Sequence, residues 1–233
     1  MEEFDFANAE WFDARDGRKV RLKDGRAMVK ATSYSVNAKE PVFADVNGDG
    51  QSDALVSLLA EGDGSFSEFT YLWLWDAKKR SPQQLRQPVT DDVRCGNVTT
   101  SIRVGKSELT VRFLDRRKFT GTCAEKPART STKQVVLRKG FLYQAKPQVS
   151  ALTPCGPAPG SEGFTPNDLS GGVFQAAPDS DAPVIVRAEG VKLWNAATDQ
   201  SGVPKGWVKA MYVPRSGSYD YADPPCGFIK TQY

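Results

Sequence analysis

The chain has 233 residues, 39% of them hydrophobic, and a formal net charge of +3. This length suits one large or two small domains, and the near-neutral charge identifies no partner. Histidine is absent, which excludes Ser–His–Asp and Cys–His hydrolases, histidine zinc sites and haem held by histidine. Because histidine is the commonest acid–base residue at neutral pH, its absence favours a protein that is not an enzyme.

Short strands and turns dominate the pattern from the N-terminus onward. Residues 18–31 hold two candidate strands around Asp24-Gly25, a pair that is typical of a β-hairpin. Residues 54–59 and 69–75 are apolar at consecutive positions, which indicates strands that are buried on both faces. We therefore expect them to form an antiparallel pair in the middle of a covered sheet.

Further along, residues 106–115 alternate, with Leu109, Val111 and Phe113 on one face of a predicted strand. Residues 146–168 are rich in Pro, Gly and Ser and form the predicted linker. The linker would separate a β-rich domain over 1–145 from a small β-rich domain over 169–233. The predicted fold class is mainly β with minor α (α+β), with antiparallel sheets in two regions.

Four cysteines stand far apart in the chain, at Cys95, Cys123, Cys155 and Cys226. Without CxxC pairs or histidine, two disulfides are favoured over a zinc site, and three connectivities are open. Sequential pairing would close two separate loops, each contributing about 3–4 kcal/mol in the loop-entropy treatment. Disulfides imply an oxidising compartment; the alternative is four buried thiols in a cytosolic protein.

Oxygen-bearing side chains alternate between residues 45 and 53, in the pattern D-x-[DN]-x-D-G-x-x-D. Ca²⁺ takes six to eight oxygen ligands, and Gly50 permits a sharp turn in such a loop. The predicted ligands of a structural Ca²⁺ are Asp45, Asn47, Asp49 and Asp53 through side chains and Gln51 through its carbonyl. Val56 replaces the bidentate Glu of an EF-hand, and a strand follows, so an EF-hand is excluded. The alternative is a metal-free turn held by its own Asx hydrogen bonds.

This loop resembles the calcium-binding blade loops of FG-GAP and integrin-type repeats. Those loops occur in several copies that close a propeller, and because the sequence holds a single copy, we do not predict a propeller. A wider pattern joins Asp45–Val56 to "YLWLWD", "PQQL", Cys95, Cys123 and "VVLRKGFLYQ". It resembles the extracytoplasmic domain of actinobacterial LppP/LprE-type lipoproteins over residues 40–145. The resemblance implies export, a cell-envelope location and a small α+β or mostly β fold, and it implies no catalytic residues. Residues 155–233 lie outside it, and the end of the chain is similar to bacterial SH3-like modules.

No apolar run approaches the length of a membrane span, and "MEEFDFANAEWF" lacks the apolar core of a signal peptide. We expect Met1 to replace a leader that is removed on export. No lipobox cysteine lies near Met1, so a lipid anchor in the native precursor stays an open alternative. The expected location is extracytoplasmic, in the periplasm or cell envelope or secreted.

Basic residues gather between Arg103 and Lys139, where eleven Lys and Arg accompany three acidic residues. The local charge of +8 contrasts with −5 for the remainder of the chain. Such a segment suits an anionic polymer or lipid headgroups, or else a solvated sheet face that discourages aggregation. Nucleic acid is not expected, because aromatic residues are not interleaved with the basic ones. The aromatic run Tyr71–Trp75 predicts core packing, with a carbohydrate platform as the alternative.

The sequence therefore predicts a non-catalytic exported or cell-envelope binding protein with one structural calcium loop. Its partner would be an envelope polymer, a lipid or another protein. One alternative is an inhibitor or regulator of a secreted or envelope hydrolase. Another is a carboxylate-dependent glycan hydrolase, which would need two carboxyl groups about 5–9.5 Å apart in a groove.

Overall fold

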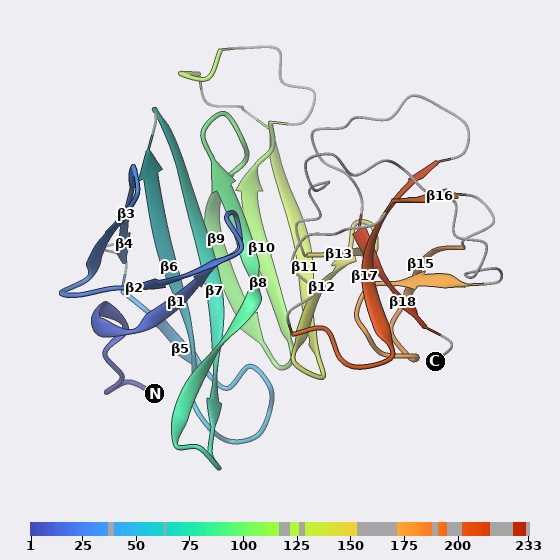
Figure 1. Cartoon of the computed structure of the whole chain (residues 1–233), viewed down its shortest axis with the longest axis horizontal. Helices are drawn as coiled ribbons and strands as arrows, with labels where there is room; N and C mark the ends of the chain where they lie inside the picture. Colours follow the sequence, from blue (N-terminus) through green and yellow to red (C-terminus); the bar gives the residue numbers. More distant parts are fainter. Residues whose placement is uncertain are drawn as a thin grey trace. The chain divides into compact units, whose positions relative to one another are not determined.

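The computed structural model describes residues 1–36, 40–62, 64–116, 122–125, 129–152, 172–187, 191–194, 202–214 and 226–231. Strands make up nearly all regular structure in these ranges, and the helix among them is one 3₁₀ turn, η1 (Phe6–Asn8). This confirms the mainly β prediction (Figure 1). The chain divides into two compact units, Met1–Leu137 and Arg138–Tyr233. This division precedes the predicted linker, most of which lies outside the described residues.

Unit 1 contains a small two-stranded sheet, a six-stranded sheet and a set of three further strands. The small sheet pairs β1 (Glu10–Asp13) with β2 (Arg18–Arg21). The six-stranded sheet has the order β3-β4-β6-β7-β8, and β5 also pairs with β6. Its strands are β3 (Arg26–Val29), β4 (Thr32–Val36), β5 (Val42–Ala44), β6 (Asp53–Gly62), β7 (Ser65–Asp76) and β8 (Ser81–Val93). The further strands are β9 (Val98–Gly105), β10 (Glu108–Leu114) and β11 (Thr130–Arg138), which are antiparallel neighbours.

The predicted central pair is confirmed, because β6 and β7 are antiparallel and β6 lies between β4 and β7. Alternate residues of the two strands face an aromatic core, in which Trp11 and Tyr71 are fully buried and Trp73 is nearly so. The Trp11 and Trp73 rings meet edge to face, with centroids 4.9 Å apart. Each such side chain contributes about 1.5–3 kcal/mol by leaving water, so this cluster is a main source of the stability of unit 1.

Two further local predictions concern unit 1. The turn at Asp24-Gly25 is present, with positive φ at 51° and 77°, and one bridge between Lys23 and Arg26 closes it. The strands beside it do not continue as a hairpin, because β2 pairs with β1 and β3 pairs with β4 in different sheets. A glycine tolerates this conformation without steric cost, which explains the Asp-Gly signal. Along β10, Leu109, Val111 and Phe113 are buried, so the residues between them belong to the opposite face.

Unit 2 pairs β12 (Phe141–Lys146) with β13 (Ser150–Ala151) and holds a five-stranded antiparallel sheet of order β15-β14-β18-β17-β16. The strands of this sheet are β14 (Val173–Gln175), β15 (Val184–Arg187), β16 (Val191–Trp194), β17 (Trp207–Pro214) and β18 (Cys226–Lys230). Phe174 and Phe228 are buried in the unit, and the Phe228 ring meets that of Phe141 at 5.6 Å. The sequence predicted a small β-rich domain over 169–233, and the likeness to SH3-like modules stays a prediction.

Asp179 joins two parts of unit 2 through an ion-pair cluster. Its side chain is 5% exposed and accepts hydrogen bonds from Arg138 Nε and, at 3.0 Å, from Lys139 Nζ. The bond from Arg138, followed by that from Lys139, lowers the pKa of Asp179 to about 2. The carboxylate therefore fastens the turn at Lys139 to the segment that follows β14.

Replacing Asp179 by Asn should destabilise unit 2 at neutral pH, because the charge shared by both cations is lost. In the unmodified chain this stabilisation is complete above the ordinary Asp pKa of about 3.9 and disappears as the pH falls through about 2. Urea unfolding, followed by circular dichroism at neutral pH and across this acidic range, measures both effects.

Asp181→Asn is the matched control, since that side chain is 76% exposed and lies 3.3 Å from Arg138. Exposed ion pairs contribute little, so its urea midpoint should stay close to that of the unmodified chain. Equal losses for the two variants would contradict the assignment of the cluster to Asp179.

Candidate functional site

The predicted calcium loop runs from the end of β5 to the start of β6, and Asp45 organises its first half. One oxygen of Asp45, Oδ1, accepts the backbone N–H groups of Gly48 at 2.7 Å and Asp49 at 3.1 Å. Its other oxygen, Oδ2, accepts the N–H group of Gly50 at 3.0 Å. A single exposed carboxylate thus gathers three backbone donors and curls the chain around itself.

Asn47 and Asp49 continue the same arrangement. Asn47 Oδ1 accepts the N–H group of Asp49 at 2.9 Å, and Asn47 Nδ2 donates to Asp49 Oδ2 at 2.9 Å. Asp49 Oδ1 accepts the N–H group of Gln51 at 2.8 Å. Gly48 and Gly50 have φ values of +77° and +82°, which glycine adopts more readily than other residues. These contacts are the Asx turns that the sequence offered as an alternative to metal binding.

Asp53, the first residue of β6, lies apart from these side chains and is fully buried. Its Oδ2 accepts from Val46 N at 3.0 Å and Asn47 N at 3.3 Å, and its Oδ1 accepts from Trp75 N at 3.0 Å. Burial raises the pKa of this carboxyl, and the three backbone bonds act in the opposite direction. Asp53 therefore joins the loop to the end of β7.

The turn between β9 and β10 also contacts the loop. Ser107 N donates to Val46 O at 2.6 Å, and a Cβ added at Gly48 would lie 2.9 Å from Lys106 Cε. The aliphatic part of Lys106 therefore covers Gly48. Its position brings a permanent positive charge to a loop that contains three carboxylates.

The four predicted side-chain ligands thus fall into two groups. Asp45, Asn47 and Asp49 bond to the loop's own N–H groups, while Asp53 bonds partly to β7. Asp45 Oδ1 and Asp53 Oδ2 each accept two hydrogen bonds already, so lone pairs are left for a cation on Asp45 Oδ2, Asn47 Oδ1 and the Asp49 oxygens, with the Gln51 carbonyl as the fifth predicted ligand. Across the described ranges, no group of three or more Asp, Glu, Cys or His side chains could hold a metal ion. Hydrogen bonds alone explain the loop's shape, and calcium ligation stays a prediction.

Of the run Tyr71–Trp75, both Tyr71 and Trp73 pack in the aromatic core, as the sequence predicted. Trp75, at the end of β7, is only partly buried and lines a hollow of about 500 Å³. The other lining residues are Met1, Glu2, Glu3, Phe4, Ser52, Arg80, Ser81 and Pro82. The alternative of a carbohydrate platform therefore does not apply to Trp73.

A second hollow, of about 330 Å³, lies on the face of β9, β10 and β11 opposite to the buried side chains of β10. Two arginines and four hydroxyl side chains line it: Ser101, Arg103, Thr110, Arg112, Thr130 and Thr132. We call this set the arginine groove. The sequence revealed the basic charge of this segment but not the groove, because a hydroxyl residue on a strand gives no signal of its own.

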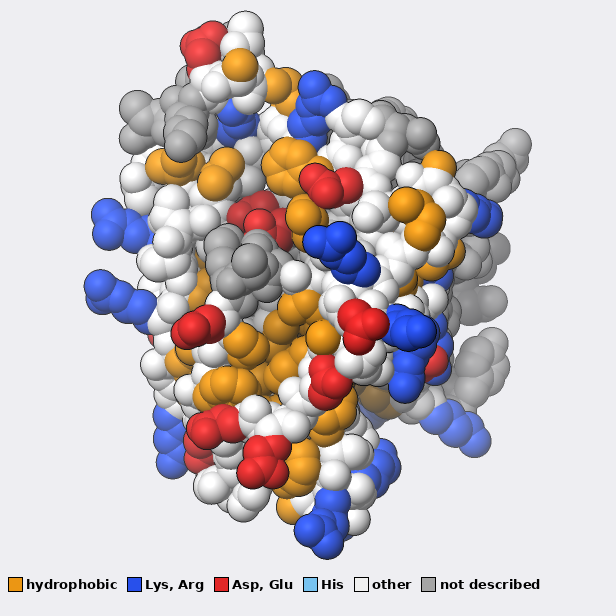
Figure 2. Space-filling view, turned by 90° about the vertical axis from the view of Figure 1, so that its left-hand side faces the viewer, with side chains coloured by type: hydrophobic (Ala, Val, Ile, Leu, Met, Phe, Trp, Pro, Cys, Tyr) orange, Lys and Arg blue, Asp and Glu red, His pale blue; other side chains and the backbone are white. Residues whose placement is uncertain are grey.

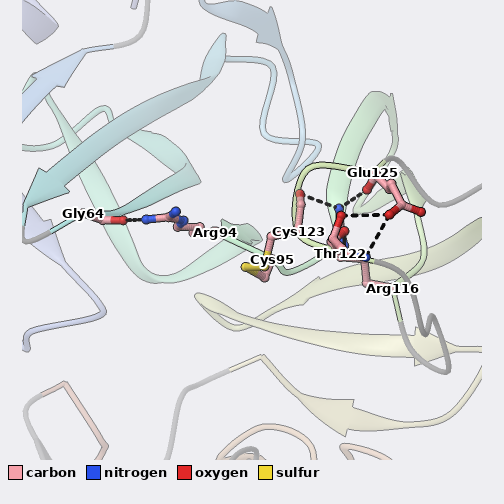
Figure 3. Close-up of a disulfide and its surroundings, with 7 residues drawn as sticks. All are labelled: Gly64, Arg94, Cys95, Arg116, Thr122, Cys123 and Glu125. Atoms are coloured by element: carbon pink, nitrogen blue, oxygen red, sulfur yellow. Dashed lines mark hydrogen bonds between the residues drawn. A yellow bond between two sulfur atoms is a disulfide. The ribbon is translucent and has the colours of Figure 1, made fainter.

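The sequence left three connectivities open, and in the structure Cys95 is bonded to Cys123, as in the sequential pairing. This bridge joins the turn after β8 to the segment after β10 (Figure 3). Arg116 donates to the backbone carbonyls of Cys123, Thr122 and Glu125 beside this bridge. The Glu125 carboxylate accepts from Thr122 Oγ1 at 2.8 Å, which lowers its pKa. Cys226 is also disulfide-bonded, whereas Cys155 lies outside the described residues.

One side of unit 1 displays hydrophobic side chains with acidic and basic groups around them (Figure 2). Unit 1 also has exposed apolar side chains at Met28 on β3, which is 68% exposed, and at Val42 on β5, which is 48% exposed. Nothing in the structure indicates what would cover this surface.

Comparison with known proteins found no matching family model, curated protein or solved structure. The resemblance to LppP/LprE-type lipoproteins therefore stays an expectation from the sequence. In the part of the chain that the structure describes, no helix has the length and apolarity needed to cross a membrane.

Replacing Asp53 by Ala should destabilise unit 1 strongly, because three backbone N–H groups lose their acceptor. The Val46 donor is buried, and those of Asn47 and Trp75 are partly buried. A buried donor left unsatisfied costs about 1–3 kcal/mol and a partly buried one less, so we expect a loss of about 2–3 kcal/mol. Chemical denaturation at neutral pH measures this change in the free energy of unfolding.

Asp49→Ala is the control for a carboxylate in the same loop. Asp49 is exposed and accepts from Gln51 N and Asn47 Nδ2, and water can replace an exposed acceptor. The expected loss is about 1 kcal/mol or less. Similar losses for both variants would contradict the distinct role given to Asp53.

Proposed function

We propose that this protein is a non-catalytic, exported or cell-envelope binding protein that recognises an anionic ligand on the arginine groove. The proposal depends on where Arg103 and Arg112 lie and on their lack of carboxylate partners among the described residues. Both are exposed on the open face of β9 and β10, and both line the groove. Among the described residues, no ion pair joins either guanidinium to a carboxylate.

Other basic residues of the same segment have partners within the protein. Arg129 lies 3.8 Å from Asp115, Lys133 lies 3.9 Å from Asp91, and Arg138 and Lys139 bind Asp179. Arg116 bonds to backbone carbonyls beside the disulfide. These side chains contribute to the structure. Of the other described basic residues of the segment, Lys106 lies beside the Asp-rich loop, and Arg103 and Arg112 are charges directed at solvent on the groove.

A location outside the cytoplasm is supported by the disulfides. Cys95 and Cys123 are both exposed, and an exposed bridge persists only in an oxidising compartment. Bacterial envelopes present phosphate-bearing polymers and anionic lipids to proteins in such a location. Guanidinium groups bind phosphate and carboxylate through paired N–H donors, which suits this class of ligand.

The Asp-rich loop serves in this proposal as a structural element near the β9–β10 turn. A bound Ca²⁺ would use the free lone pairs of Asp45, Asn47 and Asp49 and the Gln51 carbonyl, while Asp53 anchors the loop to β7. The ion would neutralise the carboxylates and stiffen the loop. No step of ligand recognition depends on the ion.

Binding to immobilised polysaccharides tests the proposed function. The chain should be retained by a phosphate-bearing polymer and not by a neutral polysaccharide of similar size, because the groove supplies positive charge. Retention should weaken as the salt concentration rises, since the Debye length shortens from about 30 Å at 0.01 M to about 8 Å at 0.15 M. Equal retention by the neutral polymer would contradict the proposal.

Calcium titration tests the loop separately. If the loop binds calcium, a calcium concentration about one hundred times the Kd of the loop should raise the free energy of unfolding by about 2.7 kcal/mol. A chelator should reverse the change. The double variant Asp45→Asn/Asp49→Asn should lose this response. The control variant Glu2→Gln/Glu3→Gln removes the same amount of charge from two exposed residues. It should keep the stabilisation by calcium. A melting temperature that calcium leaves unchanged in the unmodified chain would refute the calcium loop.

A further inference from the structure

Within the proposed function, the geometry of the groove points to a more specific ligand. We propose that the arginine groove binds a phosphodiester-linked polymer, with Arg103 and Arg112 each holding one of two successive phosphates. This inference rests on the proposed anionic ligand and adds the chemical class and the number of contacts.

The register of the strands sets the spacing of the two arginines. Arg103 on β9 lies opposite Thr110 on β10, and Arg112 on β10 lies opposite Ser101 on β9. The two arginines are therefore diagonal neighbours on one sheet face, with Cα atoms about 7–8 Å apart. Two side chains at this spacing can each contact one of two adjacent phosphates in a chain of short polyol phosphates.

Hydroxyl groups complete a row of donors beside the two cations. Thr132 on β11 lies opposite Arg112, and Thr130 lies opposite Leu114 on the same strand pair. On the β9–β10 pair, Thr110 lies opposite Arg103, and Ser101 lies opposite Arg112. A hydroxyl donates to a phosphate oxygen or to a polyol oxygen, so the row suits the alternating phosphate and alcohol groups of such a polymer.

The polymer is favoured over a membrane surface by the shape of the site. The two arginines and four hydroxyl side chains line a hollow of about 330 Å³, which a single extended chain can enter. A lipid surface is held mainly by protruding lysines and apolar side chains. Among the residues that the structure describes, six polar side chains line this hollow, and none of these six is a lysine.

One carboxylate shares this face and limits the groove at one end. Glu108 precedes Thr110 and Arg112 on β10, and its Oε1 accepts a hydrogen bond from Gln134 Nε2 at 3.0 Å. Glu108 is not among the residues that line the hollow. A polyanion bound at both arginines would therefore extend away from Glu108, toward Thr130 and Ser101.

Calorimetric titration of the full chain with poly(glycerol phosphate) tests the inference. Each Arg→Gln substitution should weaken binding by about tenfold or more, since a charge-assisted hydrogen bond to phosphate is lost. The double variant Arg103→Gln/Arg112→Gln should lose more than either single variant. Arg103→Lys/Arg112→Lys keeps the charge but not the paired donors, and it should also bind less tightly than the unmodified chain.

Arg21→Gln/Arg26→Gln is the matched control, because it removes the same charge from exposed residues of β2 and β3. Its affinity should stay within about twofold of that of the unmodified chain, as expected for distant surface charges. Melting curves of all variants show whether a loss of binding reflects a loss of fold.

Two further probes separate this inference from the proposed function. Inorganic phosphate should compete only weakly, because it occupies one arginine at a time. If it competes as well as the polymer on a per-phosphate basis, the inference fails while anion binding at the groove stands. If the groove and control variants bind the polymer equally, the groove is not the binding site, and the inference and the proposed function both fail. Binding to anionic phospholipid vesicles or to a single-stranded oligonucleotide without binding to poly(glycerol phosphate) would also overturn it. If no anionic polymer binds, the proposed function fails as well.

Discussion

The architecture of unit 1 depends on one buried carboxylate, that of Asp53. Its two oxygens accept N–H groups from the Asp-rich loop and from the end of β7, so one side chain sets both the loop and the neighbouring strand end. The loop in turn accepts a backbone hydrogen bond from the β9–β10 turn at Ser107. Because burying a charge is costly unless it is well bonded, few other residues would satisfy this position.

Much of the fold could be predicted from the sequence, because its strongest signals are local. The alternation at Leu109, Val111 and Phe113 and the Asp24-Gly25 turn follow from side-chain direction and from φ preferences. The apolar run of β6 and β7 indicated burial on both faces. The strand order and the division after Leu137 depend on contacts between distant segments, and no local pattern contains that information.

The candidate site was less predictable, for a different reason. The pattern around Asp45 identified an oxygen-rich loop, but the same residues suit either a cation or a set of Asx turns. The basic segment was recognised as a charge sum. Sequence alone could not show that Arg129, Lys133 and Arg138 have partners while Arg103 and Arg112 face an open hollow, since pairing depends on strand register.

The Cys95–Cys123 bridge has a topological consequence for recognition. The 28-residue separation that it spans includes both groove arginines, so Arg103 and Arg112 belong to one covalent ring. A single proteolytic cut within the ring would leave its two pieces joined through sulfur. The ring also lowers the conformational entropy of this segment in the unfolded chain, so the strands of the groove lose less entropy when they fold.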